Sequence, residues 1–411
     1  MPSTHEIAAG DDGTDHGDVR TLKLGEKVAA MDDLLFIPAQ HGLSDELAAP
    51  PAAAADEIEI ALDKVASLLE RAGSSLSDVV KLNLFYLGHV GIPEIDLLRR
   101  IRRRFAEPPP ALTAVPLTHL PVPRSRLQLN GIAARGSGYP GKRATPPDRG
   151  PSAQPAKAAF SPAVRVGSLI FVGGQMALGE KGNTLHAGDI VGQAEVTIRH
   201  MATVLRALGA GMESVVKLNT YYTGSGTTED WRRAAKVRSD AFVKPGPGAT
   251  GVPVVGPYPG GLLLRQDCMA IVGIDGAALP RKTSWPEGLW DWPMPVSFEQ
   301  GLLIDRMIVL GGQISADVSG RAVHPDDLVA QTAEAMHAVE RIMEGFDAEA
   351  EDLATLTVFY GTQGDPADLK KVVGVLEKHF AHGVPAFSAI PLARLGLSGT
   401  VVEIEGIGFL R

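Results

Sequence analysis

The sequence contains a single cysteine, Cys268, so no internal disulfide can form and a reducing compartment is expected. It also lacks a basic excess: 39 lysines and arginines face 48 aspartates and glutamates, which leaves a net charge of −9. That balance argues against general nucleic-acid binding, whose footprint is basic. No apolar run approaches the roughly 18 residues of a membrane span, and residues 1–19 lack a secretory pattern. We therefore expect a cytoplasmic protein without a membrane partner.

The sequence does contain one nine-residue segment in three variants. Ser214–Tyr222 reads Ser-Val-Val-Lys-Leu-Asn-Thr-Tyr-Tyr, and close variants occur at Asp78–Tyr86 and Asp352–Tyr360. The successive copies are 136 and 138 residues apart. A glutamine-containing turn repeats at similar steps, as Pro38-Ala39-Gln40, Gly173-Gly174-Gln175 and Gly311-Gly312-Gln313. Two markers with one long period predict three tandem, domain-sized copies.

Within each copy, short apolar runs alternate with apolar residues at helical spacing, which predicts the order β-β-α-β-α-β-β. Residues 136–157 are rich in Gly, Pro and Ser and read as a linker. A second linker holds three of the four tryptophans, Trp285, Trp290 and Trp292. The predicted division is a disordered tail 1–19, domain 1 over 20–135, the linker 136–157, domain 2 over 158–274, the Trp-rich linker 275–293, and domain 3 over 294–411.

Two helices cover only one face of a sheet, so each copy leaves its other apolar face exposed. Three copies in one chain can bury these faces together around a pseudo-threefold axis, with clefts between neighbours. This predicts an α+β fold arranged as a single-chain pseudo-trimer. Because closure needs no second chain, we expect a monomer of 43.3 kDa.

Several motifs resemble the RidA (YjgF) family of reactive-intermediate deaminases, and they occur in family order. They are Phe160–Gln175, the strand at Ser214–Tyr222, Pro385–Ile390 and Val402–Ile407. The resemblance implies chorismate-mutase-like units that assemble as trimers, with a ligand cleft between neighbours. It also implies hydrolysis of small enamine or imine intermediates, with no cofactor and no metal.

The resemblance further implies four parts of a site: a carboxylate-binding arginine, a glutamate near the attacking water, an aromatic residue and a Gly-Gln turn. The arginine position holds Leu112, Ala249 and Phe387, so all three copies lack the guanidinium. The glutamate position holds Gln128, Arg265 and Glu403. The remaining positions are the aromatics Phe160 and Phe298, with Gly25 in copy one, and the turns Gly174–Gln175 and Gly312–Gln313, with Ala39–Gln40 in copy one.

Glu403 is the candidate catalytic residue, because a glutamate at a cleft could position water as a general base. Glu405 lies two residues away and therefore points to the same face of the strand. We expect Phe298, the turn at Gly311–Gln313 and Phe387 beside Glu403, so that Phe387→Arg would restore the missing guanidinium. The competing interpretation of Glu403 is an ion pair between domains or a solvated edge.

Loss of an arginine–carboxylate pair removes about 1.5–3 kcal/mol of charge-assisted binding. The sequence therefore predicts a divergent hydrolase that lacks the standard family activity and acts on a small nitrogenous metabolite. The alternatives are a non-catalytic ligand-binding or interaction protein, or RNA binding through the arginine-rich segment 99–104. Arg265 could have taken over a substrate carboxylate, or could pair with Asp267 or with a carboxylate of a neighbouring copy. The Trp-rich linker could anchor on copy three or line a ligand site.

Overall fold

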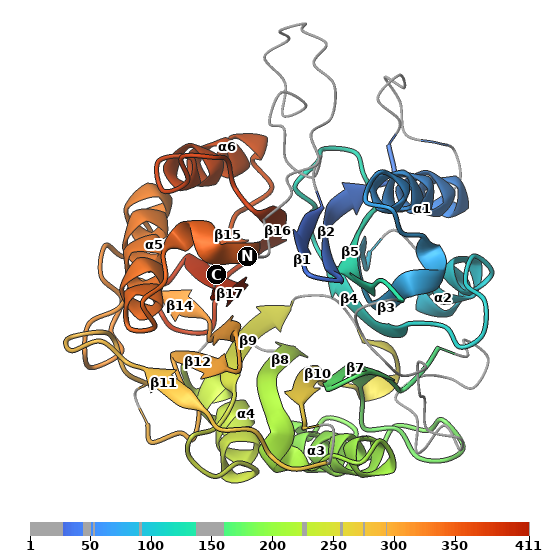
Figure 1. Cartoon of the computed structure of the whole chain (residues 1–411), viewed down its shortest axis with the longest axis horizontal. Helices are drawn as coiled ribbons and strands as arrows, with labels where there is room; N and C mark the ends of the chain where they lie inside the picture. Colours follow the sequence, from blue (N-terminus) through green and yellow to red (C-terminus); the bar gives the residue numbers. More distant parts are fainter. Residues whose placement is uncertain are drawn as a thin grey trace, which may run out of the picture.

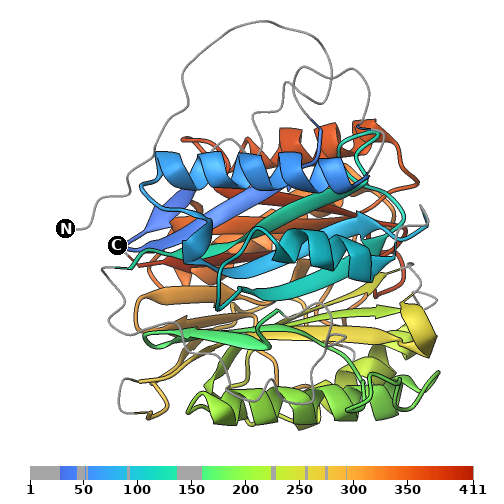
Figure 2. The same ribbon diagram turned by 90° about the vertical axis from the view of Figure 1, so that its right-hand side faces the viewer.

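The computed structural model describes residues 28–43, 51, 54–89, 93–136, 160–223, 228–254, 258–273, 276–292 and 294–410. These residues form three units, each a sheet with helices on its outer side (Figure 1). In Figure 2 the blue helix α1 and the green helix α3 lie on opposite outer sides, with the strands between them. The expected tail 1–19 lies outside the described residues, as does the linker 136–157 apart from its first residue.

The first unit has the predicted order of elements. They are β1 (Ala29–Met31), β2 (Leu34–His41), α1 (Ala54–Arg71), β3 (Val79–Leu87), α2 (Glu94–Arg102), β4 (Ala111–Leu117) and β5 (Leu127–Ala134). The spatial order of strands is β1-β2-β5-β3-β4. Only β3 and β4 run parallel among these neighbours, because α2 carries the chain back between them.

The second unit repeats this plan with the spatial order β6-β7-β10-β8-β9. Its elements are β6 (Ala163–Val166), β7 (Leu169–Gln175), α3 (Ile190–Ala207), β8 (Val215–Thr223), α4 (Thr228–Asp240), β9 (Gly248–Val254) and β10 (Leu264–Ile271). The repeated nine-residue segment forms the central part of both sheets: β3 in the first unit and β8 in the second.

The third unit adds two short strands to the common plan, and its sheet has the order β11-β12-β13-β17-β15-β16, with β14 paired to β17. Its elements are β11 (Lys282–Ser284), β12 (Gly301–Ile304), β13 (Met307–Leu310), β14 (Gln313–Ile314), α5 (Leu328–Glu344), β15 (Leu353–Gly361), α6 (Pro366–Leu376), β16 (Ala386–Leu392) and β17 (Val402–Phe409). The additional strand β11 comes from the Trp-rich segment, which is thereby tied to this sheet.

Three helices begin where an aspartate side chain accepts hydrogen bonds from backbone N–H groups of the first turn. Asp189 does so for α3, Asp327 for α5 and Asp365 for α6. Each helix then turns its apolar stripe toward its own sheet, as Val65 and Leu69 of α1 do. The helices lie around the outside of the molecule, with the sheets toward its centre (Figure 1).

The inner faces of the three sheets bury one another, as the exposed-face argument requires. One shared core contains Phe36 of the first unit, Phe171 of the second and Phe409 of the third. In a second shared core the equivalent residues Phe85, Tyr221 and Phe359 meet, with ring centroids 6.2 and 6.5 Å apart. Equivalent side chains of all three units therefore contribute to one shared core.

Buried polar pairs join neighbouring units, and they differ between interfaces. Lys81 pairs with Asp267 at 3.0 Å between the first and second units. Lys217 pairs with Glu405 at 2.8 Å between the second and third. At the remaining interface the amide of Asn130 donates to the Ser388 hydroxyl at 2.7 Å, without charge. Among the described residues, no helix has the length and apolar character needed to cross a membrane.

Candidate active site between the second and third units

Each cleft combines the arginine position of one unit with the glutamate position of the next unit. The Gly312 N–H of the third unit donates to the Ala249 carbonyl of the second at 3.0 Å. The Gly251 N–H, two residues along the same strand, donates to the Glu403 carboxylate. Glu403 therefore belongs with Ala249, and with the turn that contains Gly312.

Phe387 does not lie beside Glu403, so that expectation is wrong. Phe387 is on β16, an edge strand of the third sheet that packs against β2 of the first unit. Two residues further on, the Ala389 carbonyl accepts from Gln128 of the first unit at 2.9 Å. The expectation took both residues from copy three, whereas each cleft combines residues of two different copies.

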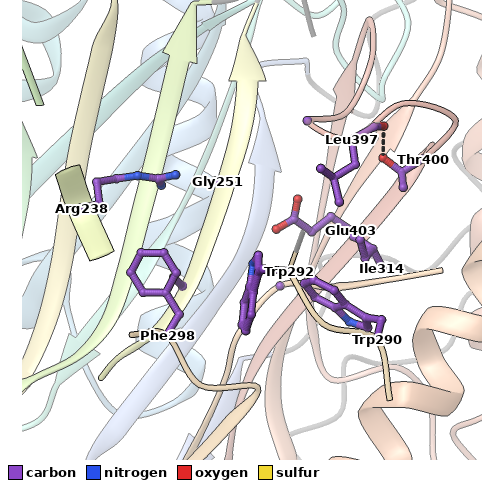
Figure 3. Close-up of a pocket in the computed structure, with 12 residues that line it drawn as sticks. Arg238, Gly251, Trp290, Trp292, Phe298, Ile314, Leu397, Thr400 and Glu403 are labelled. Atoms are coloured by element: carbon purple, nitrogen blue, oxygen red, sulfur yellow. Dashed lines mark hydrogen bonds between the residues drawn. The ribbon is translucent and has the colours of Figure 1, made fainter. Parts of the chain in front are cut away.

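A small pocket lies at the interface of the second and third units (Figure 3). Its volume is about 30 Å³, so only a few atoms of a ligand fit unless the ligand extends toward the solvent. It brings together three of the residues expected at the site, Phe298, Gly312 and Glu403. The other lining residues are Arg238, Ala249, Gly251, Trp290, Trp292, Ile314, Gly396, Leu397 and Thr400.

Glu403 lies on β17 and is 9% exposed. Burial, together with the nearby charge of Glu405, raises the pKa of Glu403 to about 8, against the opposing influence of Lys217 and the Gly251 N–H. Gly312 leaves the space that this side chain needs, because a Cβ there would overlap the Glu403 Oε1 atom. At neutral pH the carboxyl group is therefore mainly protonated and can donate a proton inside the pocket.

Arg238 reaches the pocket from helix α4, and sequence reasoning missed it. It is 1% exposed, and burial lowers its pKa to about 10, so it still carries a charge at neutral pH. In Figure 3 its guanidinium extends toward Gly251, while Glu403 approaches the same space from the third unit. The signal in the sequence was an arginine on the inward stripe of a helix, in step with Ala235 and Phe242.

Aromatic rings form one wall of the pocket. The ring centroids of Trp290 and Trp292 are 4.8 Å apart, and those of Trp292 and Phe298 are 6.1 Å apart. The Trp290 Nε1–H donates to Gln313 at 3.1 Å, which ties this wall to the Gly-Gln turn. Two residues of the Trp-rich segment, Trp290 and Trp292, thus line the pocket, and Gln313 holds Trp290 by a hydrogen bond. Edge-to-face rings of this kind keep their positions and exclude water.

The cleft between the first and second units contains the remaining predicted residues, and its polar centre is an ion pair. Arg265 binds Glu94 of helix α2 at 2.8 and 3.1 Å, and both side chains are almost fully buried. Tyr86 donates to the same carboxylate at 2.8 Å. Arg265 thus pairs with a carboxylate of the neighbouring unit, which was one of the three outcomes left open, and not with Asp267.

The other residues predicted for that cleft contact neighbouring groups of the protein. Gly174 packs against the Arg265 side chain, where a Cβ would come within 2.6 Å of Cδ. The Gln175 amide donates to the Gly173 carbonyl at 2.9 Å. Phe160 packs into the apolar core of the first unit. These residues do not line the pocket that contains Glu403.

The arginine-rich segment is largely neutralised by acidic neighbours. Arg100 and Arg104 both bind Glu59, at 2.8 and 2.7 Å, and Arg99 binds Asp96 at 3.2 Å. A paired surface of this kind does not provide the unbroken basic stripe that nucleic-acid backbones require. Among the described residues, no group of three or more His, Cys, Asp or Glu side chains is placed to hold a metal ion.

The fold and site define an α+β protein of repeated units with a small acid-containing pocket between two of them. The model of the Endoribonuclease L-PSP family matches residues 151–257 and 294–409, which correspond to the second and third units. The chain therefore belongs to this family, and the resemblance to RidA proteins is confirmed. The first unit lies outside the matched residues although it has the same strand order.

Two relatives and one solved structure illustrate the likeness. The chain is 33% identical to the mitochondrial protein mmf2 of Schizosaccharomyces pombe over 93 residues, 23% of this chain and 70% of mmf2. It is 27% identical to the 2-iminobutanoate/2-iminopropanoate deaminase of Capra hircus over 110 residues, 27% of this chain and 77% of that enzyme. A crystal structure of a chorismatase shares its fold, with 16% identity, a TM-score of 0.52, and coverage of 80% of this chain and 93% of that one.

Proposed function

We propose that the chain is a single-chain pseudo-trimer that works as a cofactor-independent hydrolase, with its active site in the pocket between the second and third units. Its substrate is a small imine or enamine. The observation that carries this proposal is Glu403, a buried acid whose pKa of about 8 keeps it protonated at neutral pH. A proton donor of this kind suits hydrolysis of a carbon–nitrogen double bond. The neighbouring turn can approach the donor closely because Gly312 has no side chain.

The chemistry needs one water and releases one ammonia. The Glu403 carboxyl donates its proton to the imine nitrogen, or to the terminal carbon of an enamine, and forms an iminium. The resulting carboxylate accepts a proton from water while the water oxygen bonds to the iminium carbon. The reprotonated Glu403 then gives its proton to the carbinolamine nitrogen, the C–N bond breaks and ammonia leaves. The hydroxyl proton returns to Glu403, and a carbonyl group remains. Glu403 thus acts first as an acid and then as a base.

Three features support this assignment over a purely binding role. A binding site does not need an acid whose pKa lies near the working pH, whereas proton transfer does. The small pocket suits a metabolite of a few heavy atoms. The curated relatives include proteins named as 2-iminobutanoate/2-iminopropanoate deaminases, which act on small imines.

A second candidate substrate is chorismate, favoured by the fold shared with a chorismatase over 80% of this chain. Chorismate contains an enol ether, and hydrolysis of an enol ether also begins with a proton delivered to carbon, followed by water addition at the neighbouring carbon. Glu403 could supply that proton as well. The ring of chorismate would have to occupy the open side of the pocket, against Trp292.

The test compares imines formed in situ by an amino-acid oxidase with chorismate, using the wild type and Glu403→Gln. We expect one substrate class to be turned over, and Glu403→Gln to lower kcat by about 10²- to 10⁴-fold. Glu299→Gln is the matched control, because Glu299 is a buried acid of the same unit that does not line the pocket. Equal rates for wild type and Glu403→Gln would exclude the proposed acid. Tight binding of these compounds without turnover would favour the non-catalytic alternative.

The assembly has its own test. Because the three sheets already bury one another within one chain, native mass spectrometry should show a monomer of 43.3 kDa. An obligate trimer of chains would contradict this arrangement.

A further inference from the structure

We propose that Gln300 and Gln313 are positioning residues that hold the Trp-rich segment against the pocket, so that its tryptophan wall limits the size of the substrate. The proposal rests on the proposed function and adds a selectivity to it, for imines or enamines with short side chains over those with large ones. Neither glutamine is among the residues that line the pocket, and both are fully buried. Their effect on a substrate must therefore pass through Trp290.

A closed ring of hydrogen bonds holds Trp290 at two points. The Trp290 Nε1–H donates to the Gln313 Oε1 atom at 3.1 Å. The Gln313 Nε2 atom donates to the Gln300 Oε1 atom at 2.8 Å. The Gln300 Nε2 atom donates to the main-chain carbonyl of Trp290 at 3.0 Å, which closes the ring. Because both the indole and the backbone of Trp290 are held, its ring has little freedom to turn away from the pocket.

The equivalent glutamine of the second unit shows what the turn needs by itself. The Gln175 amide donates to the Gly173 carbonyl at 2.9 Å, and Gln313 makes the same contact with Gly311 at 3.1 Å. Within the described residues, the Oε1 atom of Gln175 has no hydrogen-bond partner, whereas that of Gln313 accepts from the indole. Gln313 thus keeps the contact of the turn and adds contacts to the Trp-rich segment.

The second glutamine of the ring is a residue that the second unit does not have. The Gly311 N–H donates to the Gln300 carbonyl, and the Gly173 N–H donates to the Pro162 carbonyl, both at 2.8 Å. Gln300 and Pro162 therefore hold equivalent positions. A proline has no side-chain amide, so the backbone contact of this position does not require the glutamine. The amide group of Gln300 serves the contact with Trp290.

The position of Trp290 sets the position of the whole aromatic wall. The centroids of Trp290 and Trp292 are 4.8 Å apart, and those of Trp292 and Phe298 are 6.1 Å apart, so the three rings pack in series (Figure 3). Other parts of the lining are small residues, such as Ala249 and Gly312, whose side chains cannot move aside. The rings therefore decide how much of the pocket, about 30 Å³, is open to a ligand.

The beginning of the Trp-rich segment is fixed independently of the two glutamines. Strand β11 pairs with β12 of the third unit. Arg281 donates to the carbonyls of Pro245 and Val215 of the second unit, both at 2.9 Å. Loss of the glutamine contacts should therefore loosen the wall at Trp290 and leave the segment attached to both units.

The first experiment measures selectivity for substrate size. Gln313→Met and Gln300→Met keep the length of the side chain and remove its hydrogen bonds. The substrates are the imines that an amino-acid oxidase forms from alanine and from phenylalanine, in competition. The wild type should prefer the smaller imine, and each variant should lower the ratio of the two kcat/KM values by about 3- to 10-fold. Gln175→Met, the same change in the turn of the second unit, is the matched control and should keep the ratio.

The second experiment follows the wall without turnover. In a background with Trp231→Phe, the three remaining tryptophans all belong to the Trp-rich segment. Quenching of their fluorescence by acrylamide should increase in Gln313→Met and Gln300→Met, because the buried Trp290 ring becomes accessible. Gln175→Met should leave the quenching constant unchanged.

A double variant tests whether the two glutamines act as one ring. If they do, Gln300→Met combined with Gln313→Met should change the ratio by no more than about twofold beyond the larger single effect. Independent effects would multiply and would contradict the ring. Where Gln313→Met does not fold, Gln300→Met decides, because the second unit has a proline at that position.

The outcomes separate this proposal from the proposed function. If imines are hydrolysed but the wild type has no size preference, or the folded variants keep its ratio, the hydrolase stands and the positioning role fails. If no imine is hydrolysed, the hydrolase fails and quenching alone decides whether the glutamines hold the wall. A raised quenching constant then supports that role, and an unchanged constant overturns it.

Discussion

The cleft between the first and second units and the cleft between the second and third units share one backbone framework but place opposite charges on it. In the first, the strand residue is Arg265 and the facing helix supplies Glu94, and the two close into a buried ion pair. In the second, the strand residue is Glu403 and the facing helix supplies Arg238, and a pocket lies at that place. With the acidic and basic positions exchanged, the first cleft is closed by an ion pair and the second contains the candidate site.

The comparison shows how repeated copies in one chain can separate stability from chemistry. A homotrimer must use the same residues in all three clefts, so a change that improves packing in one damages the others. In this chain each cleft carries its own residues. The first cleft holds a buried ion pair, while the second holds an acid whose pKa is raised. If the two roles are separate, substitutions in the first cleft should change stability and substitutions in the second should change activity.

The largest effect should come from breaking the ion pair of the first cleft. Glu94→Ala leaves Arg265 charged and buried without its carboxylate, which typically costs about 3–5 kcal/mol. Denaturant unfolding of this variant should show that loss, while kcat stays unchanged. Glu59→Ala removes a half-exposed partner of Arg100 and Arg104, and should cost no more than about 1 kcal/mol. Equal losses of unfolding free energy in both variants would mean that the buried ion pair contributes no more to stability than the half-exposed one.

The second cleft should make stability and activity depend on pH. The folded-state pKa of Glu403, about 8, lies above its unfolded value of about 4.3. Its contribution to stability is fully present below the unfolded pKa and is lost as pH rises through the folded pKa, by up to a few kcal/mol. Turnover should also fall about tenfold per pH unit above 8, because the protonated form disappears.

The pH test needs a variant in which this group does not titrate. Glu403→Gln should give a flatter dependence of the unfolding free energy on pH between about 4 and 9. A wild type and a Glu403→Gln variant with parallel pH curves would show that Glu403 ionises normally. That result would remove the main support for the acid.

Equivalent glycines of the two turns should respond differently to the same substitution. Gly312→Ala introduces a Cβ that overlaps Glu403, and Gly174→Ala one that crowds Arg265. We expect Gly312→Ala to lower kcat by about tenfold or more, because small displacements of a reacting group slow catalysis strongly. Gly174→Ala should destabilise the fold by about 1–3 kcal/mol and keep kcat. Loss of activity in both variants would show that the clefts are coupled.

The smallest effect should come from the aromatic wall. Trp292→Leu removes a ring that packs on Trp290 and Phe298, and we expect KM to rise by about 3- to 10-fold with little change in kcat, in line with an aromatic contact of about 1 kcal/mol. Tyr258→Leu changes the ring beneath Arg265 in the other cleft and should leave KM unchanged. An effect of Tyr258→Leu on KM would place substrate in the first cleft.

Much of this architecture could be predicted from local patterns. The threefold repeat of the central strand predicted three units with the same order of elements, because each segment carries its own periodicity of apolar residues. The glutamate that persists only at Glu403, and the intact turn at Gly312, pointed to the third unit as the source of the catalytic carboxyl group, although the sequence suggested a general base and not a proton donor. Phe298, predicted as the aromatic residue of the site, does line the pocket.

By itself, then, the sequence determined the repeated unit, its faces, and which copy kept an acid. Only the tertiary structure decided which copies meet. Burial of the three inner faces in a shared core places Glu403 in one pocket with Ala249, whereas the strand of Phe387 packs against the first unit. The tertiary structure also brought Arg238 to the pocket. An arginine on a helix has no motif, and its position across from Glu403 depends on how α4 packs on its sheet and on the space left by Gly251. Contacts between distant segments come from packing, which local periodicity does not encode.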